Sequence, residues 1–298
     1  MLNHQPTLKT RLAQPGMIVA PGVFDMVSLR LADTFGFDAL YMSGFGTVAS
    51  NLGLPDAGLA TYSDMLGRVT AMAAMARTPL IADGDTGYGG LLNLRQTVRG
   101  YEAAGAAAIQ LEDQEFPKKC GHTPGRRVIA MNDMVAKIRV AIDSRSSPDF
   151  LVVARTDARS PLGLDEALRR AEAYMRAGAD ILFVESPESI DEMRRIGSAF
   201  NLPLVANMVE KGRTPVLTRA ELESIGYKIA IFPVSALLAA VRAMTGVYQT
   251  LKASGSTAGI HVPLADFSEL TKLMGFDDIW AFEKRYAEPA LAPHGERT

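Results

Sequence analysis

The chain alternates short apolar runs with longer stretches in which apolar side chains recur every three or four residues. A run that is apolar throughout is typical of a strand buried on both faces of a parallel sheet. Such runs predict eight strands, at Ile18–Pro21, Ala39–Ser43, Leu80–Asp83, Ala108–Glu112, Leu151–Arg155, Ile181–Glu185, Leu204–Asn207 and Ile229–Phe232. The stretches between them, such as Leu91–Ala104, Leu164–Ala177 and Leu217–Ser224, predict amphipathic helices. This alternation favours an α/β fold in which the strands close into a (β/α)₈ TIM-type barrel.

Glycine marks several predicted junctions between a helix and the following strand. Gly36, Gly105, Gly178 and Gly226 each lie just before a predicted strand. Glycine is favoured after the last residue of a helix because it adopts a positive φ angle at little cost. By contrast, the glycine-rich region Ser43–Tyr62 is expected to be one long loop, and loops of that length are usually functional.

No shift in composition and no Gly/Ser-rich linker divides the chain, so residues 1–298 are expected to form a single barrel domain. A chain of 298 residues suits either two average domains or one large barrel. Residues 257–298 are expected to be a helical extension, with a helical pattern over Phe267–Ala287. That extension can pack on its own barrel or on a neighbouring subunit.

The composition is that of an ordinary globular protein, with 48% hydrophobic and 21% charged residues and a formal net charge of −2. No basic excess points to nucleic acid. The polar N-terminus has no signal-peptide pattern, and no segment has the roughly 18 uninterrupted apolar residues of a membrane span. The only cysteine, Cys120, cannot form an internal disulfide. These features predict a cytoplasmic location without a membrane partner.

Polar side chains follow several of the predicted strands. They are Asp83, Asp85, Glu112, Arg155, Glu185 and Asn207. In a barrel, the carboxyl ends of all strands meet at one mouth, and that mouth carries the active site. Any one of these residues is also explained by an ordinary strand end meeting solvent. Six of them, all acid, amide or arginine, favour a functional site.

The acidic members of this group indicate a site for a hard cation. Mg²⁺ prefers oxygen ligands and often takes only one or two direct carboxylates. Without a cation, the clustered carboxylates of Asp83, Asp85 and Glu112 would repel one another. No His/Cys cluster with zinc spacing is present. Arg155 is suited to bind a substrate carboxylate because its planar guanidinium donates two parallel hydrogen bonds.

Basic residues surround the only thiol, in the segment Phe116-Pro117-Lys118-Lys119-Cys120-Gly121-His122-Thr123-Pro124-Gly125-Arg126-Arg127. Positive neighbours lower the pKa of a cysteine and raise its thiolate fraction. The glycines and proline predict a loop that closes over a bound substrate. A basic surface loop with an incidental cysteine is the competing interpretation.

Several stretches together resemble the isocitrate lyase/phosphoenolpyruvate mutase superfamily, in its order and spacing, from about residue 15 to 250. They are Tyr41-Met42-Ser43-Gly44, Leu52-Gly53-Leu54-Pro55-Asp56, Asp83-Gly84-Asp85-Thr86-Gly87-Tyr88-Gly89, Leu111-Glu112-Asp113-Gln114, Lys118-Lys119-Cys120-Gly121-His122, Ala154-Arg155-Thr156-Asp157 and Ala206-Asn207-Met208. Within that superfamily, the Lys-Lys-Cys-Gly-His loop marks carbon–carbon lyases. The resemblance implies a TIM-type barrel and a homotetramer whose subunits exchange C-terminal helices.

The resemblance also implies a role for each matching position. Asp85 would ligate Mg²⁺ directly, or Mn²⁺ in its place, with Asp56, Asp83 and Glu112 acting largely through waters. Cys120 would donate a proton to the departing enolate, and Tyr41 is by position a candidate for the base. Substrate would be held by Ser43, Gly44, Phe45, Gly121, His122, Arg155, Glu185 and Asn207.

The implied substrate is a small hydroxy or keto dicarboxylate. In methylisocitrate lyases of this superfamily, an arginine near the C-terminal helix binds a third carboxylate, whereas the matching stretch here reads Asp266-Phe267-Ser268. Alkylmalate lyases resemble this chain there and at Asn207–Pro215. The resemblance therefore favours cleavage of a 2-alkylmalate such as 2,3-dimethylmalate. Methylisocitrate lyase, oxaloacetate hydrolase or decarboxylase, and a non-enzymatic binding barrel are the alternatives.

Overall fold

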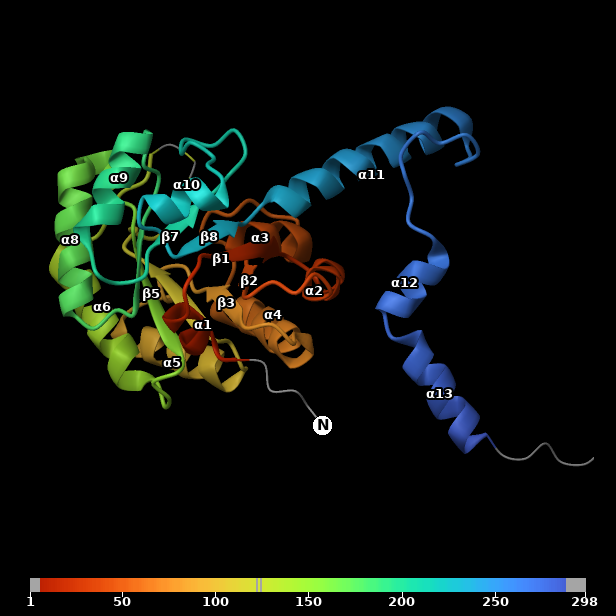
Figure 1. The fold of residues 1–298 in the computed structure, drawn as a ribbon, viewed down its shortest axis with the longest axis horizontal. Helices are drawn as coiled ribbons and strands as arrows, with labels where there is room; N and C mark the ends of the chain where they lie inside the picture. Colours follow the sequence, from red (N-terminus) through yellow and green to blue (C-terminus); the bar gives the residue numbers. More distant parts are fainter. Residues whose placement is uncertain (1–5, 122, 124, 288–298) are drawn as a thin grey trace, which may run out of the picture. The chain divides into compact units, whose positions relative to one another are not determined.

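The computed structural model describes residues 6–121, 123 and 125–287. Within them, eight strands alternate with helices along the chain (Figure 1). The strands are β1 (Ile18–Val23), β2 (Leu40–Met42), β3 (Leu80–Asp83), β4 (Ala108–Glu112), β5 (Leu151–Thr156), β6 (Ile181–Val184), β7 (Val205–Asn207) and β8 (Ile229–Phe232). The helices are α1 (Leu8–Ala13), α2 (Met26–Asp33), α3 (Gly44–Leu52), α4 (Tyr62–Met75), α5 (Leu91–Ala103), α6 (Met131–Ser144), α7 (Arg159–Leu162), α8 (Leu164–Arg176), α9 (Ile190–Ala199), α10 (Arg219–Ser224), α11 (Ser235–Ser254), α12 (Phe267–Leu273) and α13 (Phe276–Tyr286). Each predicted strand is present, with only small shifts at its ends.

The strands form a closed parallel barrel. Hydrogen bonds join neighbouring strands in the order β6-β5-β4-β3-β2-β1-β8-β7, and every pairing is parallel. A parallel bridge between Leu182 and Leu204 then joins β6 to the residue before β7 and completes the ring. The predicted (β/α)₈ fold is therefore confirmed.

Side chains of each strand alternate between the barrel interior and the layer under the helices. In β5, Leu151 and Val153 belong to the interior cluster, whereas Val152 and Ala154 pack in the outer cluster. Because successive strand residues point to opposite faces, Arg155 is the next inward residue of β5. The same alternation turns Asp83 of β3 and Glu112 of β4 inward, so the barrel itself directs these side chains to its mouth.

The predicted junction glycines are confirmed by their backbone. Gly36, Gly105, Gly178 and Gly226 have φ angles of 72°, 96°, 105° and 99°. A residue with a Cβ atom rarely adopts this left-handed conformation. Each glycine thus lets a helix end and the chain turn toward the next strand.

The prediction of one long loop over Ser43–Tyr62 is wrong, because Gly44–Leu52 form α3. Ser43 caps this helix by accepting a hydrogen bond from the Gly46 backbone N–H at 3.2 Å. Glycine disfavours helices, which is why the pattern resembles a loop. Here, however, a Cβ on Gly44 would lie 2.5 Å from Asp83 Oδ2, and one on Gly46 would lie 2.7 Å from Phe24 Cβ. These glycines are needed for close packing.

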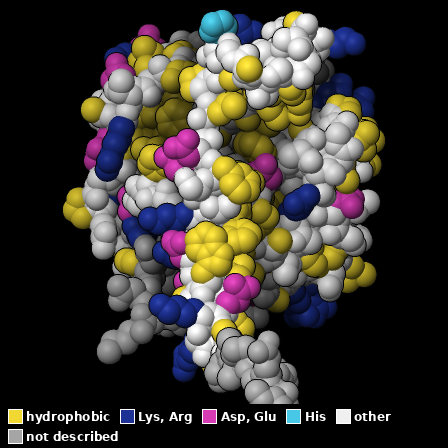
Figure 2. Space-filling view, turned by 90° about the vertical axis from the view of Figure 1, so that its right-hand side faces the viewer, with side chains coloured by type: hydrophobic (Ala, Val, Ile, Leu, Met, Phe, Trp, Pro, Cys, Tyr) yellow, Lys and Arg dark blue, Asp and Glu magenta, His cyan; other side chains and the backbone are white. Residues whose placement is uncertain are grey.

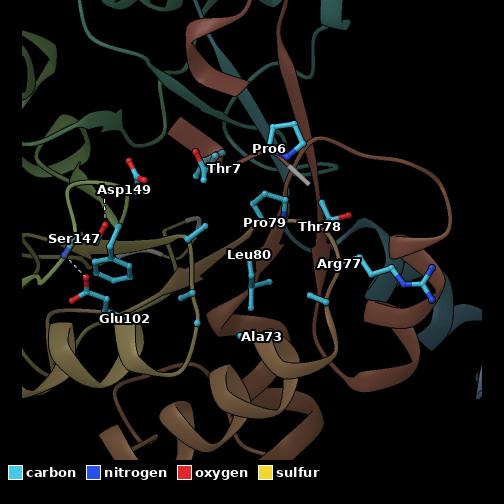
Figure 3. A pocket seen from close by; sticks show the side chains of 16 residues that line it. Pro6, Thr7, Ala73, Arg77, Thr78, Pro79, Leu80, Glu102, Ser147 and Asp149 are labelled. Atoms are coloured by element: carbon cyan, nitrogen blue, oxygen red, sulfur yellow. Dashed lines mark hydrogen bonds between the residues drawn. The ribbon is translucent and has the colours of Figure 1, made fainter. Parts of the chain in front are cut away.

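A cavity of about 950 Å³ lies at the opposite end of the barrel from the polar strand ends (Figure 3). Its lining includes Leu80, the first residue of β3, and Phe150, which precedes β5. The Glu102 carboxylate there accepts hydrogen bonds from the backbone N–H groups of Ser146 and Ser147, each at 2.7 Å. The Glu102 carboxylate therefore holds the loop that precedes β5. None of the predicted site residues lines this cavity.

The chain divides into two compact units, Met1–Arg242 and Ala243–Thr298. The second unit begins within α11 and includes the helical extension that the sequence predicts over residues 257–298. The helical pattern over Phe267–Ala287 is divided into α12 and α13, because Gly275 between them has a φ angle of 91°.

The helices α11, α12 and α13 contain no buried residue. Phe267, Trp280 and Phe282 are 80%, 54% and 63% exposed, and Figure 2 shows hydrophobic side chains at the surface of the face it presents. Large exposed apolar surfaces usually mark interaction sites. None of the described helices has both the length and the apolar character needed to cross a membrane.

Candidate active site

A pocket of about 290 Å³ lies at the carboxyl ends of the strands, within the first unit. It brings together many of the predicted site residues, namely Tyr41, Ser43, Phe45, Asp56, Asp83, Glu112, Cys120, Gly121, Arg155 and Asn207. Asp85, Gly44 and Glu185 do not line it but contact residues that do. His122 lies outside the described residues.

The acidic side of the pocket is built on a strained turn after β3. Asp85 has a positive φ angle of 48°, and its N–H donates to Asp83 Oδ1 at 3.0 Å. A non-glycine residue in this conformation is uncommon and often marks a functional position. The strain turns Asp85 back toward Asp83, and both side chains are buried.

Lys118 lies among these acids. Its Nζ pairs with Asp56, and with Asp85 Oδ1 at 2.5 Å, and its side chain is only 4% exposed. The described residues offer no group of three His, Cys, Asp or Glu side chains arranged to hold a metal ion. The lysine supplies positive charge at the place where the sequence predicts a cation.

The electrostatics of the acids nevertheless fit a cation. Burial, reinforced by Asp83 and Asp56 and opposed by Lys118, raises the pKa of Asp85 to about 7. Burial likewise raises the pKa of Glu112 well above its usual range, against the effect of Arg155. The buried Glu112 Oε1 accepts no hydrogen bond within the described structure, and Asp85 Oδ1 is contacted there by the Lys118 ammonium. Oxygen atoms left in this state are suitable ligands for Mg²⁺, directly or through water.

Arg155 is held rigidly at the mouth by Asp157. Its Nε and Nη2 each donate to the Asp157 carboxylate at 2.9 Å, and its Nη1 lies 3.2 Å from Glu112 Oε2. The guanidinium also lies 5.2 Å from the centre of the Phe183 ring. This arrangement fixes the plane of the guanidinium in the pocket wall, as a receptor for a substrate anion requires.

Tyr41, Glu185 and Asn207 complete the inner wall. The Asn207 amide donates to Glu185 Oε2 at 3.0 Å. The Tyr41 hydroxyl lies 3.1 Å from Gln110 Oε1 and 3.4 Å from Asp83 Oδ2. Burial, reinforced by Asp83, raises the pKa of Tyr41 well above its usual range. A phenol that stays protonated is better suited to donate a hydrogen bond than to act as the base.

The loop between β4 and α6, residues 113–130, forms one side of the pocket and is called the Cys120 loop below. As predicted, it contains no helix within its described residues. Cys120 is partly exposed and lines the pocket. At the next residue, Gly121, an added Cβ would lie 2.5 Å from Arg155 Nη2 and 2.9 Å from Glu185 Cδ. Only glycine lets the loop approach Arg155 so closely.

Sequence reasoning did not select Gln110, Lys118, Arg126 or Asp157 as site residues. Asp157 offered a signal, since it follows Arg155 at the end of a predicted strand. Gln110 lies inside β4, where no polar pattern distinguished it. Lys118 and Arg126 belong to the basic segment that the sequence links to the pKa of Cys120, and their buried partners Asp56 and Asp157 are distant in the sequence.

These features define the class of protein, a (β/α)₈-barrel enzyme whose acid-rich active site lies at the carboxyl end of the barrel. The phosphoenolpyruvate phosphomutase family matches residues 8–252, and the chain belongs to this family, within the phosphoenolpyruvate mutase/isocitrate lyase superfamily.

Relatives in this superfamily carry several activities. The chain is 47% identical to 2,3-dimethylmalate lyase of Eubacterium barkeri, over 96% of this chain and 99% of that protein. It is 42% identical to 2-methylisocitrate lyase of Aeropyrum pernix, over 94% and 89%. A structure of oxaloacetate acetylhydrolase with 3,3-difluorooxalacetate superimposes with a TM-score of 0.90 at 33% identity, covering 97% and 99%. A phosphonopyruvate hydrolase complex with oxalate and Mg²⁺ has a TM-score of 0.81 at 31% identity, covering 91% and 95%.

Proposed function

We propose that this protein is a Mg²⁺-dependent carbon–carbon lyase. Its substrate would be a 2-hydroxy dicarboxylate of the 2-alkylmalate type, such as 2,3-dimethylmalate, and its products an α-keto acid such as pyruvate and a carboxylic acid. We further propose a homotetramer, which the family resemblance implies, and a cytoplasmic location, which the composition predicts.

The mixed lining of the pocket is the observation that carries this proposal. The lining combines the charged residues Asp83, Glu112 and Arg155 with apolar side chains, namely Phe45, Val209, Ile231, Pro233, Val234 and Leu238. A branched alkyl chain between two carboxylates matches both kinds of lining residue, because apolar groups gain by leaving water while the anions keep charged partners.

The cations of the pocket argue against a third substrate carboxylate. Among its lining residues, Arg155 is the receptor proposed for one substrate carboxylate, Lys118 is paired with buried acids, and Lys119 is exposed. The resemblance to the superfamily also implies that Phe267 stands where methylisocitrate lyases have an arginine for this carboxylate. The 47% identity to 2,3-dimethylmalate lyase supports the same choice.

The chain's own residues bind and orient the substrate. Arg155 would pair with a carboxylate, and the start of α3, at Ser43 and Phe45, would receive the α-keto-acid end, because the first backbone N–H groups of a helix have no intrahelical partner. Gly121, Glu185 and Asn207 would close the pocket around it, with His122 on the same loop. Asp85, Asp56, Asp83 and Glu112 would hold Mg²⁺, which, when bound, stabilises negative charge on substrate oxygens.

Cleavage then requires two proton movements. A base removes the proton of the 2-hydroxyl, the C–C bond breaks as the ketone forms, and the bonding electrons leave on the enolate of the second fragment. The Cys120 thiol gives its proton to the carbon of that enolate. The raised pKa of Tyr41 favours a different group as the base, with Tyr41 donating a hydrogen bond beside Asp83.

A substrate panel tests the proposal. Purified enzyme with Mg²⁺ is assayed for product release from 2,3-dimethylmalate, 2-methylisocitrate and oxaloacetate. An unpaired carboxylate lacks a charge-assisted hydrogen bond, so kcat/KM for dimethylmalate should exceed that for methylisocitrate by roughly 10- to 150-fold. Equal or better cleavage of methylisocitrate, or preferred hydrolysis of oxaloacetate, would overturn the proposed substrate.

A further inference from the structure

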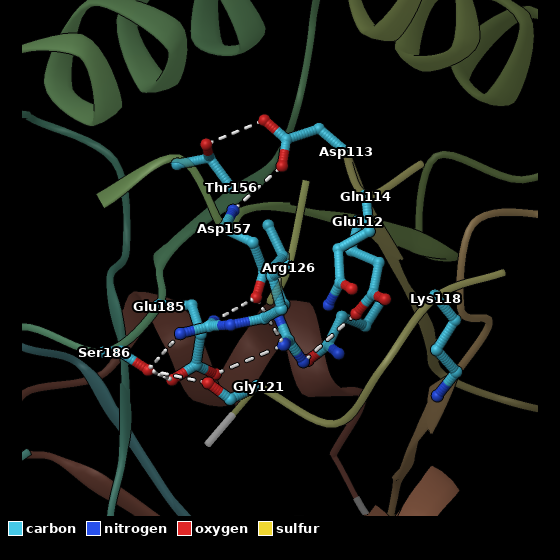
Figure 4. A network of polar contacts seen from close by, with 12 residues as sticks. Glu112, Asp113, Gln114, Lys118, Gly121, Arg126, Thr156, Asp157, Glu185 and Ser186 are labelled. Atoms are coloured by element: carbon cyan, nitrogen blue, oxygen red, sulfur yellow. Dashed lines mark hydrogen bonds and ion pairs between the residues drawn. The ribbon is translucent and has the colours of Figure 1, made fainter. Parts of the chain in front are cut away.

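Arg126 of the Cys120 loop is buried, although it lies in a basic segment. Its side chain is 1% exposed. Nη1 donates to Asp157 Oδ1 at 2.6 Å, and Nη2 donates to Ser186 Oγ at 3.4 Å (Figure 4). Nη2 also donates to Ser160 Oγ at 2.5 Å. The neighbouring Arg127 is 75% exposed and pairs with Glu115 at the surface. The two adjacent arginines therefore differ in burial and in partner: Arg126 is buried against Asp157, and Arg127 is exposed beside Glu115.

The partner of Arg126 is the same carboxylate that orients Arg155. Asp157 Oδ1 accepts from both Arg126 Nη1 and Arg155 Nη2, while Oδ2 accepts from Arg155 Nε. Asp157 is completely buried. A buried carboxylate shared by two guanidinium groups depends on both, because removing one changes the charge balance at the other.

The rest of the loop closes against the same group of residues. Ser186, which also accepts from Arg126, donates through Oγ to the Gly121 carbonyl at 3.0 Å. Gly121 in turn packs against Arg155 and Glu185. Cys120 therefore lies between two buried attachments of the loop, Lys118 at the acids and Arg126 at Asp157.

We propose that Arg126 is a positioning residue that holds the Cys120 loop closed and, through Asp157, fixes the orientation of Arg155. Closure of the loop would then bring the Cys120 thiol to the pocket and, in the same step, orient Arg155 to bind the substrate anion. Arg126 Nε has no hydrogen-bond partner in the described structure. The closed loop therefore keeps one buried donor unsatisfied, and the free-energy cost of that donor favours reopening of the loop. The catalytic consequence rests on the proposed function, whereas the closure itself does not.

Alkylation of the single thiol tests the closure directly. Iodoacetamide labelling of Cys120 is timed in enzyme free of metal and substrate. Arg126→Met removes charge-assisted hydrogen bonds from the closed loop, so labelling should accelerate by at least about tenfold. Loss of a nearby positive charge alone would slow alkylation, because it lowers the thiolate fraction. Faster labelling therefore reports opening of the loop.

Arg127→Met is the matched control and should label at the wild-type rate. Ser160→Ala removes a single contact of Arg126 and should give a smaller acceleration, so it keeps the test available if Arg126→Met does not fold. In the assay with the preferred substrate, Arg126→Met should raise KM and lower kcat together, whereas Arg127→Met should change neither.

A purely structural role of Arg126 predicts a lower Tm with unchanged labelling and unchanged KM, and that result would overturn the proposal. If no 2-hydroxy dicarboxylate is cleaved but labelling accelerates as expected, the proposed function fails and the role of Arg126 in closure stands.

Discussion

Single residues in the pocket are held by contacts that leave them little freedom. Asp157 fixes the guanidinium plane of Arg155 with two hydrogen bonds of 2.9 Å. Gly44 must lack a side chain because Asp83 occupies the space where a Cβ would lie. Such preorganisation lets a site stabilise developing charge without rearranging in the transition state.

Cys120 is the residue whose chemistry can be tested most directly. Cys120→Ser keeps the size of the side chain, but a hydroxyl is a far weaker acid than a thiol. General acid catalysis is typically worth about 10²–10⁴-fold, so kcat should fall by that order. Substrate binding should change little, as measured by KM and by calorimetric titration with an α-keto acid.

The competing interpretation, an incidental thiol on a surface loop, predicts a nearly normal kcat for the serine variant. It also predicts that substrate and Mg²⁺ leave iodoacetamide labelling of the wild-type enzyme unchanged, whereas a proton donor in the pocket should be protected. A serine variant that keeps more than about a third of wild-type kcat is incompatible with general acid catalysis by Cys120.

At the scale of elements, the strands were predictable because a barrel buries them on both faces. Residues Leu80–Asp83 are apolar until the final Asp83, and residues Ala108–Glu112 are apolar apart from Gln110 and the final Glu112; both strands have the predicted bounds. The inward alternation then explains why Asp83, Glu112 and Arg155 meet at one mouth. A strand pattern thus carries information about the site as well as about the fold.

Contacts between distant segments could not be predicted in the same way. The glycines of α3 make its sequence resemble a loop. They are required because Asp83 and Phe24, which lie outside this helix, pack closely against it. The pairs Lys118–Asp56 and Arg126–Asp157 join residues 62 and 31 positions apart. No local pattern distinguishes these cations from solvated ones, so the structure of the Cys120 loop was needed to find them.

The turns after β3 and β4 lead to a prediction about metal. Because the acids there are buried close together, prolonged EDTA treatment should abolish activity, and Mg²⁺ or Mn²⁺ should restore it. A cation that binds only the folded protein should also raise Tm, since saturation at about 100 Kd adds about 2.7 kcal/mol of stability. Asp85→Asn should lose both effects in activity assays and in calorimetric melting.

Thr70→Ala, a change on the exposed surface of α4, serves as the control and should respond to EDTA and Mg²⁺ like the wild type. Full activity of the wild-type enzyme after rigorous chelation would contradict the assignment of a metal to these acids.

At the scale of the whole molecule, the two compact units differ in the exposure of their large apolar side chains. The first unit buries its apolar residues in the barrel interior and under its helices. In the second unit, Phe276, Ile279 and Trp280 of α13 are all at least 41% exposed. A helix that exposes so many large apolar side chains gains little from folding alone, because helical stability in proteins comes mostly from packing.

This difference predicts that α13 is covered by another subunit in the assembled protein. Burying a large apolar side chain contributes about 1.5–3 kcal/mol, so losing two of them should weaken an assembly severely. The double variant Trp280→Glu/Phe282→Glu should therefore elute with a smaller mass than the homotetramer expected of the wild type, as measured by light scattering after size-exclusion chromatography. Arg285→Glu, which introduces the same side chain on the same helix, should keep the wild-type mass. A monomeric wild type, or a double variant of unchanged mass, would refute an assembly built on α13.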